Sequence, residues 1–220
     1  MQDVFLKDFG GISSPSGTNI FDNTNAFANA ISILRRDGGG TLTVTKGVWY
    51  TGPIELFSDI TLKIEEDAEI SFLTDENRYL PVYTRWEGVD CYAMHPCIFA
   101  NGQKNVRITG KGTINGNGRV WWEKRIANKM QKEPKTALQF KFAGLNPDYK
   151  NQPSGGGGRN IQFLRPPLIQ FYKSTDCVIE DVRVCNSPFW TVHPVYCKNV
   201  VISGIRVENP AENASPAAWG

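Results

Sequence analysis

The hydrophobic positions near the N-terminus follow the period of an α-helix. Four apolar residues lie three or four positions apart and share one helix face: Phe27, Ala30, Ile31 and Leu34. A polar run at residues 23–25 precedes them, and Asp37 followed by three glycines comes after them, which are start and stop signals of a helix. The pattern predicts one short amphipathic helix within residues 22–38.

After this helix the period of the pattern changes to two. Apolar residues alternate with threonine, lysine and other polar residues in several short runs: residues 42–50, 60–64, 68–70 and 106–113. Strands that bury one face show this alternation. Turn residues such as Gly47 and the pair Gly52-Pro53 separate the runs. The chain is therefore expected to consist of many short strands.

The strand pattern also repeats along the chain. Residues 177–186 align with residues 200–209 at an offset of 23 positions, with six positions that keep their apolar character and with a recurring Arg and Asn. Residues 105–110 align with residues 199–204 as a more distant copy. A repeat of roughly 20–50 residues is typical of solenoids, and one coil of this length holds three short strands. The repeat predicts a parallel β-helix, with a β-sandwich whose strands match by chance as the alternative.

The predicted architecture is one all-β domain that spans residues 1–220. The end of a solenoid exposes an apolar interior and unpaired strand edges, so the first coil needs a cover. The helix over residues 22–38 is expected to cap that coil and to have no catalytic role. A doubly wound α/β fold is disfavoured because only one helix pattern is convincing.

Composition and charge exclude two classes of function. The chain has 24 Lys and Arg against 22 Asp and Glu, a net charge of +2, and 40% of its residues are hydrophobic. This balance argues against a dedicated nucleic-acid binder, and no run of about 18 apolar residues is present to span a bilayer. The sequence thus predicts a globular protein with neither a nucleic acid nor a membrane as its partner.

The positive charge is concentrated in one segment, residues 119–163. This segment carries a net charge of +6, whereas the rest of the chain carries −4. Trp121, Trp122 and Tyr149 lie among its cations, and it contains a run of four glycines at residues 155–158. One interpretation is an insertion beside a groove that offers cations and aromatic faces to an anionic polymer. The other is a solvated surface insertion.

The five cysteines lack a metal-binding spacing. No Cys-x-x-Cys occurs among Cys91, Cys97, Cys177, Cys185 and Cys197, so a zinc site is not indicated. We interpret them mainly as small buried apolar residues, with one disulfide, such as Cys91 with Cys97, left open.

Several segments resemble glycoside hydrolase family 28, the polygalacturonases and their relatives, especially bacterial members of the exo-acting kind. The N-terminal segment Asp8-Phe9-Gly10-Gly11 is similar to the start of the family's cap, and residues 47–54 are similar to its first coil. Four further segments are close to typical family segments: residues 84–88, 108–116, 165–171 and 186–194.

The resemblance implies both a fold and a reaction. The implied fold is a right-handed parallel β-helix of the pectin-lyase type. The implied reaction is hydrolysis of α-1,4-linked galacturonic acid in pectin, with inversion at the anomeric carbon and without a cofactor or a metal. Pectin or another acidic polysaccharide is then the expected partner, and the expected localisation is secreted or periplasmic. The start at Met1-Gln2-Asp3 lacks the basic and apolar regions of a signal peptide, but this does not argue against secretion.

The catalytic motifs of the family are absent from this sequence. Members of the family take their acid and base from an Asn-Thr-Asp segment and an Asp-Asp pair, followed by Gly-His-Gly and Arg-x-Lys segments. Here Ala217, Ala218 and Trp219 stand at the Asn-Thr-Asp positions, and the other motifs do not occur. We therefore expect no catalytic residue in this chain. It would correspond to the N-terminal portion of a family member, without the family's C-terminal coils, and would be inactive alone. Its uncapped last coil is expected to favour self-association.

Four residues are expected to contact the substrate. Trp190 and His193 fall on the coil next to the expected position of the catalytic coil, and Trp122 and Arg159 belong to the basic insertion. The family's catalytic histidine belongs to a later motif, so His193 is expected to line the substrate or to be structural. His95 is treated as structural.

Three functions remain open at this point. The first is a family 28 glycosidase portion or inactive variant, and the second is a non-enzymatic β-helix that binds acidic polysaccharide. The third is a self-associating scaffold. Polysaccharide lyases share the β-helix but need calcium bound by carboxylates, and the sequence has no acidic cluster of that kind.

Overall fold

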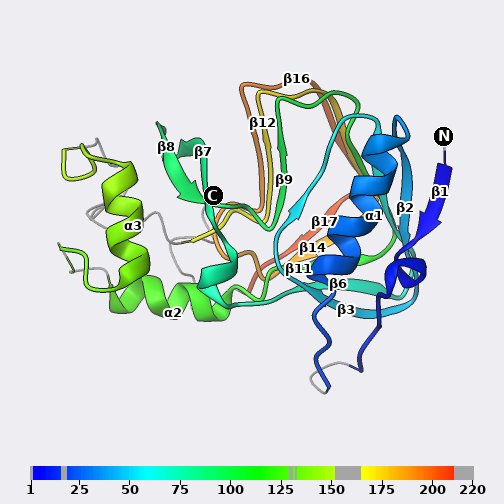
Figure 1. Ribbon diagram of the computed structural model, residues 1–220, viewed down its shortest axis with the longest axis horizontal. Helices are drawn as coiled ribbons and strands as arrows, with labels where there is room; N and C mark the ends of the chain where they lie inside the picture. Colours follow the sequence, from blue (N-terminus) through cyan, green and yellow to red (C-terminus); the bar gives the residue numbers. More distant parts are fainter. Residues whose placement is uncertain (1, 16–18, 129–130, 132, 152–164, 211–220) are drawn as a thin grey trace.

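Three parallel sheets wind around one apolar interior. The computed structural model describes residues 2–15, 19–128, 131, 133–151 and 165–210. Each of the four complete coils contributes one strand to each of three sheets, named A, B and C in chain order, and successive coils stack in parallel (Figure 1). The strand β1 adds to sheet A before them, and β16 and β17 add to sheets A and B after them. This is the parallel β-helix expected from the repeat.

The sheets have six, five and four strands. Sheet A contains β1 (Gln2–Phe5), β2 (Gly40–Val44), β5 (Ile60–Ile64), β10 (Arg107–Gly110), β13 (Thr175–Glu180) and β16 (Lys198–Ser203). Sheet B contains β3 (Gly47–Thr51), β6 (Ala68–Phe72), β11 (Thr113–Asn115), β14 (Arg183–Cys185) and β17 (Arg206–Glu208). Sheet C contains β4 (Ile54–Glu55), β9 (Ile98–Asn101), β12 (Ile169–Tyr172) and β15 (Val192–Val195).

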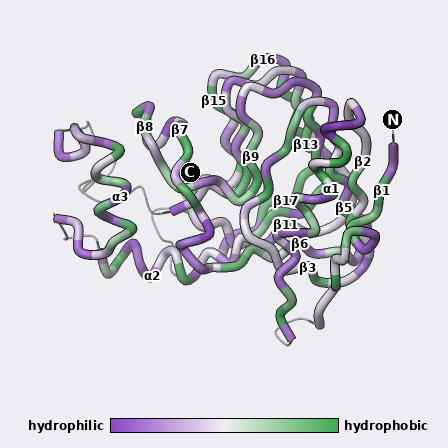
Figure 2. The backbone as a smooth tube through the Cα atoms, in the orientation of Figure 1, coloured by the Kyte–Doolittle hydropathy of each residue, from purple (hydrophilic) through white to green (hydrophobic). Residues whose placement is uncertain are grey.

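The register of the strands stacks like residues on like. In sheet A a column of interior residues runs from coil to coil, each paired with the next: Leu42, Leu62, Ile108, Ile179 and Ile202. The strands β13 and β16 pair at the predicted offset of 23, since Cys177 faces Val200. Hydrophobic and hydrophilic residues alternate along the stacked strands (Figure 2), so each strand sends one set of side chains inward and the other outward.

The helix α1 (Thr24–Arg36) covers the first coil. Its buried residues Phe27, Ile31 and Leu34 belong to the same core as the strands. Glycine is required where the chain leaves this helix: Gly40 has a φ of 149°, and a Cβ there would lie 2.1 Å from the carbonyl oxygen of Gln2. The stop signal seen in the sequence is therefore also a point of close backbone contact between β1 and β2.

Two excursions leave the β-helix between sheet B and sheet C. The first contains the 3-10 helix η2 (Glu76–Arg78) and an antiparallel hairpin of β7 (Pro81–Trp86) and β8 (Val89–Met94). The second contains α2 (Arg119–Ala127) and α3 (Ala137–Leu145), which belong to the basic segment. Because both leave at the same corner, they lie together beside sheet C (Figure 1).

The coil formed by β16 and β17 is the most exposed part of the stack. Val201, Ile202 and Val207 are 50%, 41% and 51% exposed. Their counterparts one coil earlier are Val178, which is 9% exposed, and Ile179 and Val184, which are fully buried. The next coil in a stack normally removes such side chains from water.

Candidate functional site

The hairpin β7–β8 covers the outer face of sheet C. In each strand of this sheet one residue faces inward and the next outward, so Phe99, Gln170 and His193 form an outward row in paired register. Val82 of the hairpin packs on a small separate cluster of Phe99, Tyr172 and Val195. The hairpin therefore buries the first part of this row and leaves His193 at its edge.

Gln170 connects the hairpin to His193. It is fully buried, and its side-chain oxygen accepts a hydrogen bond from the Thr84 hydroxyl at 2.7 Å. Its Nε2 donates to the Arg85 carbonyl at 3.3 Å and lies 2.8 Å from His193 Nδ1. Because this nitrogen is a donor, His193 Nδ1 acts as the acceptor and the ring proton is on Nε2. His193 thus keeps one N–H donor for another partner.

The structure brings His193 and Trp190 together, as required for the predicted substrate contacts. Their ring centroids lie 3.8 Å apart in an edge-to-face arrangement, and Trp190 stacks on Phe189 at 4.8 Å. Both Trp190 and His193 are half-buried. Burial, and then the positive charge of Arg85, lower the pKa of His193 to about 4. The imidazole is consequently neutral above that pH and unsuited to act as a cationic acid at neutral pH.

Two arginines lie near this aromatic pair. Arg85 forms an ion pair with Asp90 at 3.4 Å and a hydrogen bond with the hydroxyl of Tyr196. Arg165 lies over the Phe189 ring at 4.5 Å and is 4% exposed. Its Nε and one terminal nitrogen have no hydrogen-bond partner among the residues that the structure describes.

The environment of Arg165 favours a negative ligand. Burial, and then the neighbouring Arg125, lower the pKa of Arg165 to about 10. The guanidinium nevertheless stays charged at neutral pH. Cations held at low dielectric create a positive potential, and the carboxylates of Asp90 beside Arg85 and Glu87 near Arg165 reduce it. A carboxylate ligand at the Trp190–His193 pair would compete with these two acids for the arginines.

The basic insertion packs against the loop that carries Phe189 and Trp190. Trp122 is 7% exposed, and its indole N–H donates to the Ser187 carbonyl at 2.9 Å. Asn146, after α3, exchanges two 2.9 Å hydrogen bonds with the backbone of Tyr92 in β8. The structure thus places Trp122 in the core, where it holds the loop that carries Phe189 and Trp190. Its contact with a substrate stays a prediction.

The structure does not describe the other predicted site positions except His95. Arg159 and the segment Ala217, Ala218 and Trp219 lie outside the described residues. His95 is half-buried, and its Nδ1 lies 2.7 Å from the Pro96 carbonyl. Sequence reasoning missed Thr84, Arg85 and Gln170. The one available signal was Gln170, a polar residue between apolar neighbours in a predicted strand.

No disulfide joins any of the five cysteines, all of which lie within the described residues. Cys91, Cys97, Cys177 and Cys185 are buried and Cys197 is half-buried. The disulfide left open between Cys91 and Cys97 is not formed, and most of the thiols pack as small apolar side chains, as the sequence suggested.

The part of the chain that the structure describes contains no group of three or more His, Cys, Asp or Glu that would hold a metal ion. Among the same residues, no helix has the length and hydropathy needed to cross a membrane.

The chain is similar to known proteins over most of its length. The model of the family described as Glycosyl hydrolases family 28 matches residues 40–151. A probable polygalacturonase of Vitis vinifera is 31% identical over 217 residues, which cover 94% of this chain and 37% of that protein.

Solved structures show the same relationship. The exopolygalacturonase of Thermotoga maritima superposes with a TM-score of 0.76 at 34% identity, over 94% of this chain and 47% of that one. The family 28 exopolygalacturonase of Yersinia enterocolitica shares the fold with a TM-score of 0.66 at 23% identity, over 94% of this chain and 39% of that one. The chain therefore spans less than half the length of each of these three relatives.

Proposed function

Because the chain belongs to family 28 of the glycosyl hydrolases, we propose that it is the substrate-holding part of an enzyme that hydrolyses the galacturonate polymer of pectin. The observation that carries this proposal is the Trp190–His193 pair beside Arg85 and Arg165. An aromatic face offers an apolar surface to a sugar ring, the His193 N–H offers a hydrogen bond to a hydroxyl, and the arginines attract carboxylates.

The hairpin favours action at the end of a polymer. A chain lying on His193 has no path over Gln170 and Phe99, because the hairpin buries both side chains almost completely. A groove closed on one side accepts a chain end more readily than an internal segment. We therefore propose end-directed cleavage, an activity that the names of the Thermotoga and Yersinia relatives also state.

We also propose that these 220 residues alone do not turn over substrate. An inverting glycosidase needs one protonated carboxyl and one carboxylate, roughly 6.5–9.5 Å apart, on opposite faces of the sugar. The sequence lacks the family's Asn-Thr-Asp and Asp-Asp segments. Of the two acids of the hairpin, Asp90 in β8 is engaged by Arg85 and Tyr196, and Glu87 in the turn also has a partner. We also propose that the protein is secreted or periplasmic, as the resemblance to the family implies.

Reducing-end release from polygalacturonate tests this proposal. The 220-residue chain is compared with a chimera in which its coils are followed by the remaining coils of the Thermotoga maritima exopolygalacturonase. We expect turnover by the chimera alone, with monomer as the main early product, and loss of that turnover in Trp190→Leu. Turnover by the 220-residue chain would contradict the proposal, and longer early products from the chimera would contradict end-directed cleavage.

A second candidate function is binding of acidic polysaccharide without hydrolysis. The buried, hydrogen-bond-deficient Arg165 favours it, because this cation would attract an anionic chain whether or not catalysis follows. Retained affinity of the 220-residue chain for oligogalacturonate, together with an inactive chimera, is the result expected from this function.

A third candidate is self-association through the last described coil. Val201, Ile202 and Val207 are exposed there although their counterparts in the preceding coil are buried. Sedimentation at several concentrations tests this candidate: self-association predicts a mass that rises with concentration and a smaller rise in Ile202→Lys. A constant monomer mass would contradict it.

A further inference from the structure

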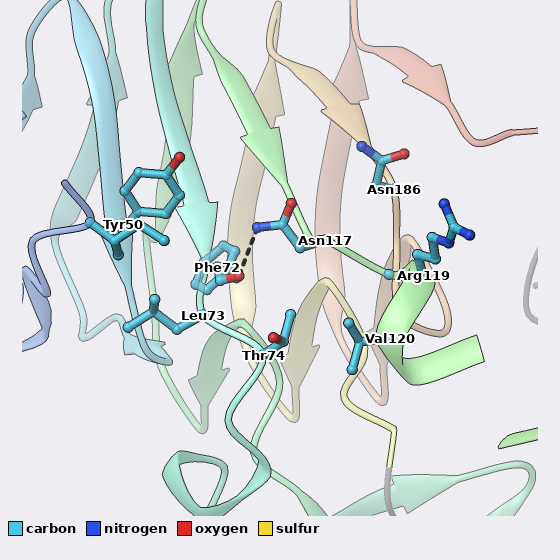
Figure 3. Close-up of a pocket in the computed structure, with 10 residues that line it drawn as sticks. Tyr50, Phe72, Leu73, Thr74, Asn117, Arg119, Val120 and Asn186 are labelled. Atoms are coloured by element: carbon cyan, nitrogen blue, oxygen red, sulfur yellow. Dashed lines mark hydrogen bonds between the residues drawn. The ribbon is translucent and has the colours of Figure 1, made fainter. Parts of the chain in front are cut away.

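A second groove opens where the strands of sheet B end, and neither Trp190 nor His193 lines it. It encloses about 500 Å³, within the roughly 300–1,000 Å³ typical of small-molecule sites. The side chains that line it come from the ends of β3 and β6 on one side and from the start of α2 on the other (Figure 3). Four successive coils and the basic insertion thus build one cavity.

Two asparagines supply acceptors to this groove. Asn117 and Asn186 both have a φ of 48°, a left-handed conformation that asparagine tolerates. The side-chain nitrogen of Asn117 donates to Ser71 Oγ and to the Phe72 carbonyl, each at 2.9 Å, and that of Asn186 donates to Asn115 at 3.1 Å. The nitrogens are therefore used within the fold. The side-chain oxygens of Asn117 and Asn186 accept no hydrogen bond from a residue that the structure describes, so they are available to hydroxyl donors.

The charge of the groove favours an anion. Arg119 is its one charged lining residue, and no acidic side chain lines it within the described parts of the chain. The ion pair between Arg119 and Glu123 is highly exposed, and such pairs contribute little free energy. A ligand carboxylate can therefore compete for Arg119. The first turn of α2 points its backbone N–H groups the same way, and Gly118 provides no side-chain cap.

An apolar surface completes the groove. Phe72, Leu73 and Val120 line it, and Thr74 adds a hydroxyl at its edge (Figure 3). An apolar wall, amide acceptors, a hydroxyl and one cation together suit a ring that carries both hydroxyls and a carboxylate. A neutral apolar ligand would leave the amides unpaired.

We propose that this groove is a second saccharide site that binds one uronate residue of an acidic oligosaccharide. Arg119 pairs with the carboxylate, Asn117 and Asn186 accept from ring hydroxyls, and Val120 lies against the ring. The choice of a uronate rests on the proposed function, whereas the groove itself does not. A polymer bound here as well as at the Trp190–His193 pair would be held near the enzyme between cleavage events.

Calorimetric titration of the 220-residue chain with trigalacturonate tests the site. Two variants address the groove: Arg119→Gln removes its charge, and Val120→Trp fills it from a partly exposed position of α2. The control Arg36→Gln removes an equally exposed, ion-paired arginine from α1. Trp190→Leu disables the site on sheet C, and Trp190→Phe replaces it if the unfolding midpoint shows that the leucine variant is not folded.

We expect the Trp190→Leu variant still to bind trigalacturonate. Adding Arg119→Gln to this variant should weaken the affinity about tenfold, the loss typical of one charge-assisted hydrogen bond. Val120→Trp is expected to abolish that binding, and Arg36→Gln to leave it unchanged. Neutral galactotriose should bind more weakly and without dependence on Arg119.

The outcomes separate this proposal from the proposed function. Unchanged affinity in both groove variants, with binding lost in Trp190→Leu, would overturn the second site and support the site on sheet C. Binding that depends on the groove and not on Trp190 would support the second site and count against the site on sheet C. An absence of binding in the wild-type chain would overturn both.

Discussion

The hydrogen bonds of Gln170 should couple the stability of the hairpin to that of sheet C. The perturbation is Gln170→Leu, which keeps the side-chain volume and removes all hydrogen-bonding atoms. It deletes bonds of 2.7 Å to Thr84, 3.3 Å to the Arg85 carbonyl and 2.8 Å to His193. Since Gln170 is fully buried and Thr84 is 1% exposed, water does not replace these bonds.

The magnitude follows from those contacts. Each buried hydrogen bond contributes about 1 kcal/mol net, and an orphaned partner adds to the loss. We expect Gln170→Leu to lower the free energy of unfolding by about 3 kcal/mol. With a urea m-value of about 3 kcal/mol/M, the unfolding midpoint should fall by about 1 M.

Thr84→Val provides the matched partner for a double-mutant cycle. Thr84→Val alone leaves the Gln170 oxygen buried without a donor and should cost about 1–2 kcal/mol. In the double variant both partners are apolar, so its loss should be smaller than the sum of the single losses by about 1 kcal/mol.

Urea titrations followed by tryptophan fluorescence measure all four proteins. The reasoning would be refuted by a midpoint shift of less than about 0.2 M in Gln170→Leu, or by strictly additive losses in the cycle. Either result would mean that the hairpin does not depend on this hydrogen-bond network.

Three further predictions concern His193, Trp122 and the thiols. The pKa of His193 is about 4 in the folded chain against 6.5 in the unfolded chain, so the unfolded state binds more protons between these pH values. Unfolding titrations should therefore show a free energy of unfolding that falls as the pH is lowered from 6.5 to 4. In His193→Phe this fall should be smaller. Trp122→Phe, which loses the bond to Ser187, should lower the unfolding free energy by at least about 1 kcal/mol in the same assay; no change would contradict its bracing role. At pH 8 a thiol reagent should modify at most Cys197 in the folded chain and all five cysteines in denaturant; rapid modification of more than one thiol in the folded chain would contradict the burial.

The fold was predictable because a β-helix is built from local information. The alternation of apolar residues sets which side chains of a strand face inward, and turn residues set where the chain bends. The offset of 23 between residues 177–186 and 200–209 therefore matches the pairing of β13 with β16. The same offset separates Gln170 from His193, so the stacking of these two residues was already contained in the repeat.

The excursions were less predictable. Net charge identified residues 119–163 as an insertion, but it did not show that Trp121 and Trp122 are buried. Trp121 packs edge-to-face on Tyr79, 5.1 Å away, and Trp122 bonds Ser187, 65 positions further along the chain. No period relates these partners, because each belongs to a different excursion or coil.

The sequence by itself determined the solenoid, its capping helix and the family, since these depend on a repeated pattern and on matched segments. Only the tertiary structure decided what surrounds His193: the hairpin over sheet C, the link through Gln170, and the burial and Arg85 charge that lower the pKa of the imidazole. The physical reason is that interior stacking recurs once per coil and is recorded as a period. The site instead arises where two non-repeating segments pack against the stack, and such packing depends on the shapes and charges of residues far apart in the chain.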